Sequence, residues 1–75
     1  MYILSKDKKI LIQFGGANGF TMLNVVRNFG GKDKYAITAG GTQVMGMYPE
    51  EKNALDELSK IMEALEEGRN SYTMN

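Results

Sequence analysis

Residues 49–68 read PEEKNALDELSKIMEALEEG, and this stretch decides the fold. Proline is favoured at the first position of a helix, and the two glutamates that follow it interact favourably with the helix dipole. Apolar residues then recur at the period of an α-helix, and the stretch ends on a glycine, which commonly stops helices. The pattern predicts one amphipathic helix over about 49–67, with a single apolar stripe formed by Ala54, Leu55, Leu58, Ile61, Met62 and Leu65.

Short apolar runs precede this helix, and turn residues separate them. The pair Gly40-Gly41 lies between two such runs, and it predicts a tight hairpin because the turns of short hairpins need positive φ. The polar run at residues 6–9 lies between two others and predicts a second hairpin. The predicted strands therefore lie within residues 2–47, and residues 71–75 form either a short last strand or a tail.

Residues 20–29 fit two interpretations. Their apolar residues recur at helical spacing, with a threonine placed to cap and a glycine placed to stop a helix. The adjacent β-branched residues Val25 and Val26, and the strands predicted on either side, indicate a strand instead, which we favour. The sequence thus predicts one α+β domain over residues 1–75: a four- to five-stranded antiparallel β-meander with one amphipathic C-terminal helix packed on one face.

The composition excludes several classes of function. The chain has 75 residues and contains neither cysteine nor histidine. Disulfides, thiolate chemistry, the commonest general base and the commonest transition-metal ligand are therefore all missing. Adjacent acidic residues of the predicted helix, such as Asp56 and Glu57, point in different directions and are expected to form a solvated face. We expect no enzyme, no metal site and no cofactor.

Size and patterning both favour self-association. A domain this small usually needs a disulfide, a metal or a partner chain for stability, and only the partner chain remains here. One helix also covers only one side of a sheet, so apolar residues on the other side need a cover. The residues concerned are among Leu11, Met22, Met45 and Met47. The sequence therefore predicts a homo-oligomer.

Charge is divided between the two parts of the chain. Residues 1–48 hold six basic and two acidic residues, whereas residues 49–75 hold three basic and seven acidic ones. The net charge is zero, so non-specific DNA binding is not expected. No apolar run approaches the roughly 18 residues that cross a bilayer, and charge appears too early for a signal peptide. We expect no membrane partner and a cytoplasmic location.

The run Gly15-Gly16-Ala17-Asn18-Gly19 holds more glycine than a turn requires. It follows a predicted strand, as phosphate-binding loops do, but it lacks the lysine and hydroxyl residue that end a P-loop. Two interpretations stay open: a flexible turn, or a nest of main-chain amides that binds a phosphate, with basic side chains as counter-charge. In the second, the ligand-binding residues are Gly15, Gly16, Asn18, Gly19, Arg27, Lys32, Lys34, Thr42 and Gln43.

Residues 34–65 combine a hairpin, a strand that ends in an aliphatic-Gly-x-Tyr pattern at 45–48, and an acidic helix start. Together with the opening MYILSKDKK, this arrangement resembles small proteins that are common in phages and mobile elements of Gram-positive bacteria. The resemblance implies a counter-defence role. Such factors include oligomeric sponges that sequester nucleotide signals of bacterial immune systems, and inhibitors that cover a surface of a host protein.

Composition, pattern and resemblance combine into one leading hypothesis and two alternatives. The leading hypothesis is a non-enzymatic homo-oligomer in the host cytoplasm that sequesters a small anionic, nucleotide-like signal. The first alternative is a protein–protein inhibitor of a host defence protein. The second is a structural accessory protein without a ligand.

Overall fold

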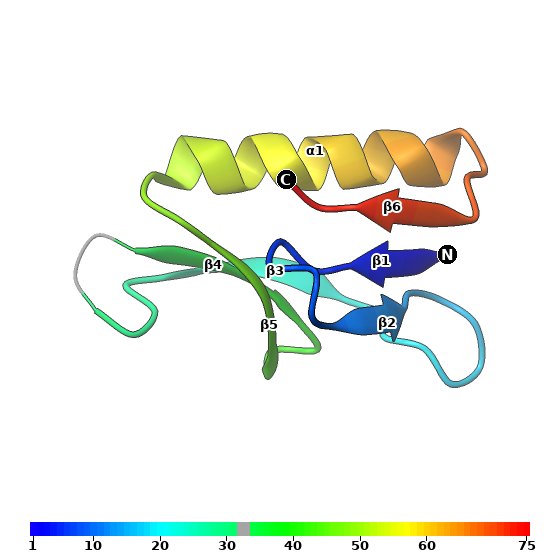
Figure 1. Cartoon of the computed structure of the whole chain (residues 1–75), viewed down its shortest axis with the longest axis horizontal. Helices are drawn as coiled ribbons and strands as arrows, with labels where there is room; N and C mark the ends of the chain where they lie inside the picture. The colour runs from blue at the N-terminus through cyan, green and yellow to red at the C-terminus, as the bar shows by residue number, and fades with distance from the viewer. Residues whose placement is uncertain (32–33) are drawn as a thin grey trace.

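Residues 1–31 and 34–75 are the parts of the chain that the computed structural model describes, and they form six strands and one helix (Figure 1). The α+β class predicted from the sequence is confirmed. In chain order the elements are β1 (Tyr2–Leu4), β2 (Leu11–Gln13), β3 (Leu23–Arg27), β4 (Tyr35–Ala39), β5 (Gln43–Tyr48), α1 (Glu51–Glu66) and β6 (Ser71–Thr73).

The strands form two three-stranded sheets. In one, β3, β4 and β5 are antiparallel neighbours in chain order, which is the predicted meander. In the other, β1 lies in the centre, antiparallel to β2 and parallel to β6. The predicted hairpin of β1 and β2 and the predicted short C-terminal strand, β6, are therefore present, but the prediction of one antiparallel sheet is wrong, because these three strands form a second sheet. Parallel pairing of β1 with β6 joins the two ends of the chain, and no local sequence pattern reports such a distant partner.

Both predicted hairpins are confirmed. Gly40 and Gly41 have φ of 62° and 77° in the turn between β4 and β5, as a tight hairpin turn requires. The polar run between β1 and β2 closes through a 2.8 Å hydrogen bond from the amide of Ser5 to the carbonyl of Ile10. Within the run, Lys8 itself adopts a positive φ of 67°.

The ambiguous segment 20–29 contains a strand, β3, as favoured from its β-branched residues. Its register with β4 places Asn24 opposite Thr38. The hydroxyl of Thr38, which is fully buried, donates a 2.8 Å hydrogen bond to the Asn24 side-chain oxygen. A strand is favoured over a helix here because it places Val25 against the core and satisfies this buried hydroxyl.

The helix is close to its predicted bounds, but its start differs. Glu50 is extended, with φ of −131° and ψ of 146°, and caps the helix, so Pro49 precedes it and does not occupy the first helical position. The helix stops as predicted at Gly68, whose φ is 72°. The amides of Gly68 and Arg69 then bond back to the carbonyls of Leu65 and Ala64, which satisfies the free carbonyls of the last turn.

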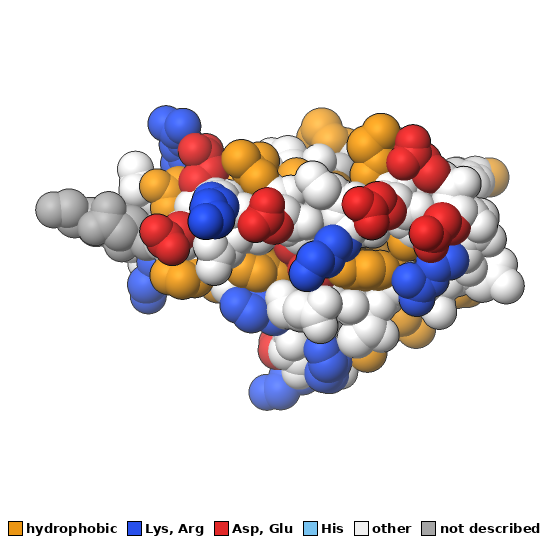
Figure 2. All heavy atoms as spheres, turned by 90° about the horizontal axis from the view of Figure 1, so that it is seen from above, with side chains coloured by type: hydrophobic (Ala, Val, Ile, Leu, Met, Phe, Trp, Pro, Cys, Tyr) orange, Lys and Arg blue, Asp and Glu red, His pale blue; other side chains and the backbone are white. Residues whose placement is uncertain are grey.

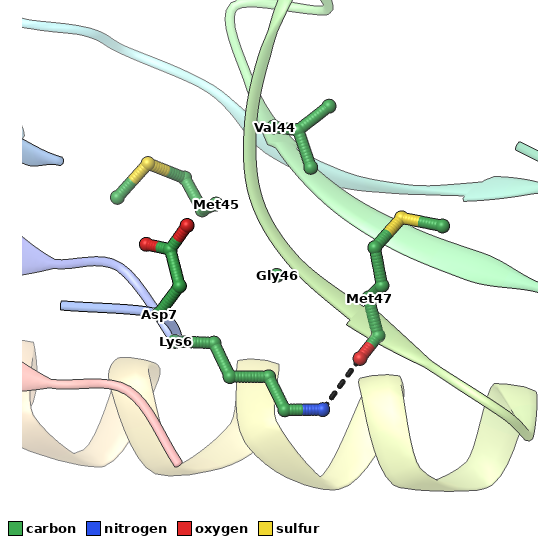
Figure 3. A pocket seen from close by; sticks show the side chains of 6 residues that line it. All are labelled: Lys6, Asp7, Val44, Met45, Gly46 and Met47. Atoms are coloured by element: carbon green, nitrogen blue, oxygen red, sulfur yellow. Dashed lines mark hydrogen bonds between the residues drawn. The ribbon is translucent and has the colours of Figure 1, made fainter. Parts of the chain in front are cut away.

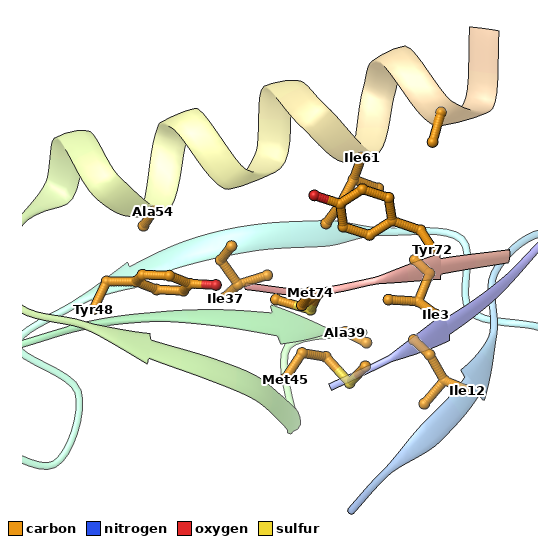
Figure 4. Packing of buried hydrophobic residues seen from close by; sticks show 11 residues of the cluster. Ile3, Ile12, Ile37, Ala39, Met45, Tyr48, Ala54, Ile61, Tyr72 and Met74 are labelled. Carbon is orange, nitrogen blue, oxygen red and sulfur yellow. The ribbon is translucent and has the colours of Figure 1, made fainter. Parts of the chain in front are cut away.

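The core lies below the helix, between it and the two sheets. Figure 4 shows side chains of both sheets, such as Ile3 and Ile37, pointing into one interior beneath α1. The sheets are also joined directly, because the amide of Lys6 donates to the carbonyl of Met45 at 2.8 Å. Met45 belongs to the core and is 1% exposed, so it does not lie on the open apolar face predicted for it. Leu11 and Met22 are exposed as predicted.

Candidate functional site

The predicted ligand-binding residues lie at two opposite ends of the β3–β5 sheet. The run Gly15–Gly19 leads into the start of β3, and the amide of Gly40 donates to the carbonyl of Met22 at 2.9 Å, so the hairpin with Thr42 and Gln43 lies at that same end. Arg27 ends β3 at the other end. Five residues of strand, a length of about 13 Å, separate the two groups.

The basic part of the predicted site is divided further. Arg27 donates from Nε and Nη2 to the two carboxylate oxygens of Glu51, at 3.0 and 3.2 Å. The hydrogen bonds and the negative charge of Glu51 raise the pKa of Arg27 above its ordinary value. Lys34 is exposed just before β4, and Lys32 lies outside the described residues. The guanidinium of Arg27, which is predicted to bind a phosphate, is therefore paired with the carboxylate of Glu51 in the same chain.

The glycine run closes on itself. The amide of Gly15 donates to the carbonyl of Phe20 at 2.7 Å, and the amide of Phe20 donates to the carbonyl of Gln13 at 2.9 Å. A Cβ atom at Gly19 would overlap the carbonyl oxygen of Gly15, so only glycine fits there. The flexible-turn interpretation thus accounts for Gly15 and Gly19 without a ligand.

Two hollows lie on either side of Lys6. The first, of about 420 Å³, is lined by residues 6–7 and 44–47 (Figure 3). The second, of about 370 Å³, lies between β5, the first half of α1 and Asn75. The Lys6 ammonium donates to the carbonyl of Met47 and lies 4.1 Å from the centre of the Tyr48 ring, so its charge is already engaged. Neither hollow contains a residue of the predicted site. The second is lined by the carboxylates of Asp56 and Glu57 and by the ammonium groups of Lys6 and Lys60.

Glu57 is buried, so its predicted place on the solvated face of the helix is wrong. It is 3% exposed, whereas a solvated position was expected. Its Oε2 accepts hydrogen bonds from the hydroxyl of Tyr72 at 2.8 Å and from the amide of Asn75 at 3.1 Å. The hydroxyl of Tyr48 donates to the carbonyl of Asn75 at 2.9 Å. Glu57 lies three residues after Ala54 and four before Ile61, on one side of the helix, but Leu58 fits the same spacing, so the sequence did not single out Glu57.

This buried network raises two pKa values. Burial, and then the charge of Glu57, raises the pKa of Tyr48 to about 12. Burial and the hydrogen bond to Glu57 raise the pKa of Tyr72 well above its ordinary value. Both tyrosines therefore stay neutral in the folded chain at pH values where an exposed tyrosine loses its proton.

The network predicts a loss of stability in alkali. Below pH 10 both tyrosines are neutral in both states and their contribution is constant. Above pH 10 the unfolded chain releases protons that the folded chain keeps, so the free energy of unfolding falls by about 1.4 kcal/mol per pH unit for each tyrosine until the folded pKa is reached. Urea unfolding at several pH values in this window measures the slope. Tyr48→Phe is expected to reduce the slope, and an unchanged slope would contradict the assignment.

The helix carries a second apolar line that the sheets do not cover. The sequence predicted one packed stripe, but α1 buries Ala54, Glu57, Ile61 and Ala64. The other residues of the predicted stripe lie beside this buried line and are here called the outer stripe: Leu55, Leu58, Met62 and Leu65. Leu58 also packs against the edge of the core, whereas the other three face solvent. Leu55, Met62 and Leu65 are 48%, 60% and 40% exposed, and Leu58 is half-buried.

Apolar packing and hydrogen bonding act together in this orientation of the helix. Ala54, Ile61 and Ala64 pack in the core on the line that contains Glu57, and Tyr72 and Asn75 satisfy the Glu57 carboxylate there. The outer stripe lies next to this buried line on the helix, where its exposed side chains contact solvent. Figure 2, which looks onto the helix, shows apolar side chains along one edge of it and a row of acidic side chains beside them.

Comparisons with known proteins identify no similar protein. No protein-family model matches the chain, and no curated protein or solved structure is significantly similar to it. In the part of the chain that the structure describes, no helix is long and apolar enough to cross a membrane. Over the same residues, no three acidic side chains come together as a metal ion would require.

Proposed function

We propose that this chain is a non-enzymatic protein-binding module and that the outer stripe of α1 is its binding surface. The observation that supports this proposal is the exposure of large apolar side chains in one line along the helix. A single exposed leucine is ordinary on a protein surface, but a contiguous apolar line bordered by charges is typical of an interface. The proposal is compatible with two hypotheses from the sequence, the protein–protein inhibitor and the homo-oligomer, because both require a surface that binds another protein chain.

The geometry supports protein binding better than nucleotide capture. Within one chain, the strand β3, with a length of about 13 Å, separates the glycine run from Arg27, so these residues do not form one compact pocket. Arg27 would also have to leave Glu51. Nucleotide capture stays a prediction, and it would need residues from two copies of the chain. The phage-type resemblance supplies the context of the proposal, in which the protein acts against host defence.

The surroundings of the outer stripe define the chemistry of its partner. Lys52, Ser59 and Glu66 are exposed and follow one another at seven-residue intervals, so they form a line directly beside the stripe. A matching surface presents apolar side chains in the middle, a negative charge opposite Lys52 and a positive charge opposite Glu66. An amphipathic helix with the reverse order of charges fits this description.

Site-specific photo-crosslinking in cells that naturally make the protein tests the proposal. A benzophenone side chain at position 59, beside the outer stripe, is expected to form a covalent adduct with one protein of defined mass. The matched control carries the same group at position 60, which points to the opposite side of the helix from the stripe. Adducts that are absent at position 59, or identical at both positions, would overturn the assignment of this surface.

A further inference from the structure

We infer that the partner of the outer stripe is a second copy of this chain, bound helix to helix in antiparallel orientation about a two-fold axis. The inference rests on the proposed function, because it names the partner of the same surface. It is carried by two independent observations: the spacing of the apolar residues and the order of the charges beside them.

The apolar spacing is that of a two-helix seam. Leu55, Leu58, Met62 and Leu65 are separated by three, four and three residues, which is the a/d pattern of two heptads. In an antiparallel pair whose axis passes near residue 60, Leu55 of one copy packs beside Leu65 of the other. Leu58 packs beside Met62 in the same way. Leu55, Met62, Leu65 and the exposed part of Leu58, whose other side packs against its own core, are then covered in one symmetric contact.

The charges beside the seam select the antiparallel orientation. With the axis at this position, Lys52 of one copy lies beside Glu66 of the other, and the symmetry makes this pair twice. Ser59 meets its own copy near the axis, where a charged residue would repel itself. A parallel pair would instead bring like ends together and would leave Lys52 and Glu66 without partners. The same chain therefore supplies the partner that the surface requires.

The size of the contact predicts a weak dimer. The helix has 16 residues, a length of about 24 Å, and the contact is confined to one side of it. Such an interface lies at the low end of specific interfaces, so we expect a dissociation constant of roughly 1–100 μM. This self-association also supplies the partner chain that a small domain without disulfides needs.

Sedimentation equilibrium of the purified chain tests the inference. The mass is expected to rise from 8.3 kDa toward twice that value as the concentration increases from about 1 μM to 1 mM. Met62→Glu places a charge in the seam from both copies and is expected to weaken the dimer by roughly a hundredfold or more. Lys60→Glu changes charge on the opposite side of the helix and is expected to have no effect. Far-UV circular dichroism establishes that each variant keeps its fold.

A charge-exchange cycle tests the orientation. Lys52→Glu and Glu66→Lys each place like charges together twice, and each is expected to weaken the dimer by roughly tenfold. The double variant exchanges the two charges and is expected to restore the original dissociation constant. Restoration supports the antiparallel contact, whereas additive weakening, or no effect of either single variant, overturns it.

The outcomes also separate this inference from the proposed function. A chain that stays at 8.3 kDa at the highest concentration overturns the inference. If position 59 nevertheless forms an adduct with a different protein, the proposed function stands and only the partner is wrong. An adduct of twice the chain mass at position 59 supports both. A monomer without any adduct overturns both.

Discussion

Replacing Ile61 with alanine is expected to lower the free energy of unfolding by about 2–4 kcal/mol. Ile61 is 1% exposed and lies below α1 among the side chains of both sheets (Figure 4). Its truncation leaves a cavity that a small, densely packed core cannot fill. Because a domain of this size is stabilised by only about 4–11 kcal/mol in total, the loss is a large share of its stability. Urea unfolding followed by far-UV circular dichroism measures it.

The adjacent residue is the matched control. Met62 is 60% exposed on the outer stripe, so Met62→Ala is expected to change the stability of the monomer by less than about 0.5 kcal/mol. Both variants are compared below about 1 μM protein, where the proposed dimer is dissociated and does not add to stability. The two variants differ by one position on the same helix and lose side chains of similar size. Equal losses of stability would show that the helix does not face the sheets as described.

Replacing Glu57 with alanine is expected to cost about 2–4 kcal/mol. The substitution removes the acceptor of the Tyr72 hydroxyl and of the Asn75 amide, and both hydrogen bonds end on a charged group. The buried Tyr72 hydroxyl then has no partner, which is costly in a core. The same urea measurement reports the loss, and selective exchange of the Asn75 amide with deuterium reports release of the C-terminal segment.

Two further variants separate the hydrogen bonds from helix propensity. Glu57→Gln keeps an oxygen that can accept both hydrogen bonds, so we expect a smaller loss than for alanine. Glu63→Ala removes an exposed carboxylate from the same helix and is expected to change stability within about 0.5 kcal/mol. A loss at Glu57 no larger than the loss at Glu63 would contradict the buried network.

The elements that could be predicted from sequence are those encoded by neighbouring residues. The turn at Gly40-Gly41 requires positive φ, which glycine adopts without strain. The two apolar runs that flank this turn are neighbours in the chain, so they pair with each other. The helix follows from its period and from Gly68 at its end. Even the ambiguous strand β3 was favoured correctly, because Val25 and Val26 are β-branched.

The candidate site could not be predicted in the same way. The glycine run and Arg27 are twelve or fewer residues apart along the chain, yet β3 holds them at opposite ends of its sheet. Arg27 is bound by Glu51 from the first turn of α1, a contact between elements that no local pattern contains. Glu57 was misplaced because a carboxylate is normally solvated, and only the hydroxyl of Tyr72 and the amide of Asn75 make its burial favourable.

The sequence by itself thus determined the class of the fold, two hairpins, β3 and the extent of the helix, because the interactions that form them act over a few residues. Tertiary structure alone decided that β6 pairs with β1 and that Glu57 faces the core. The contacts of Glu57 act together with the packing of Ala54, Ile61 and Ala64 to hold one side of the helix against the sheets. The rotation of the helix about its own axis then divides one apolar stripe of the sequence into a buried line and an outer stripe. Such a division depends on the partners that each side chain finds across the fold, which are far apart in the chain.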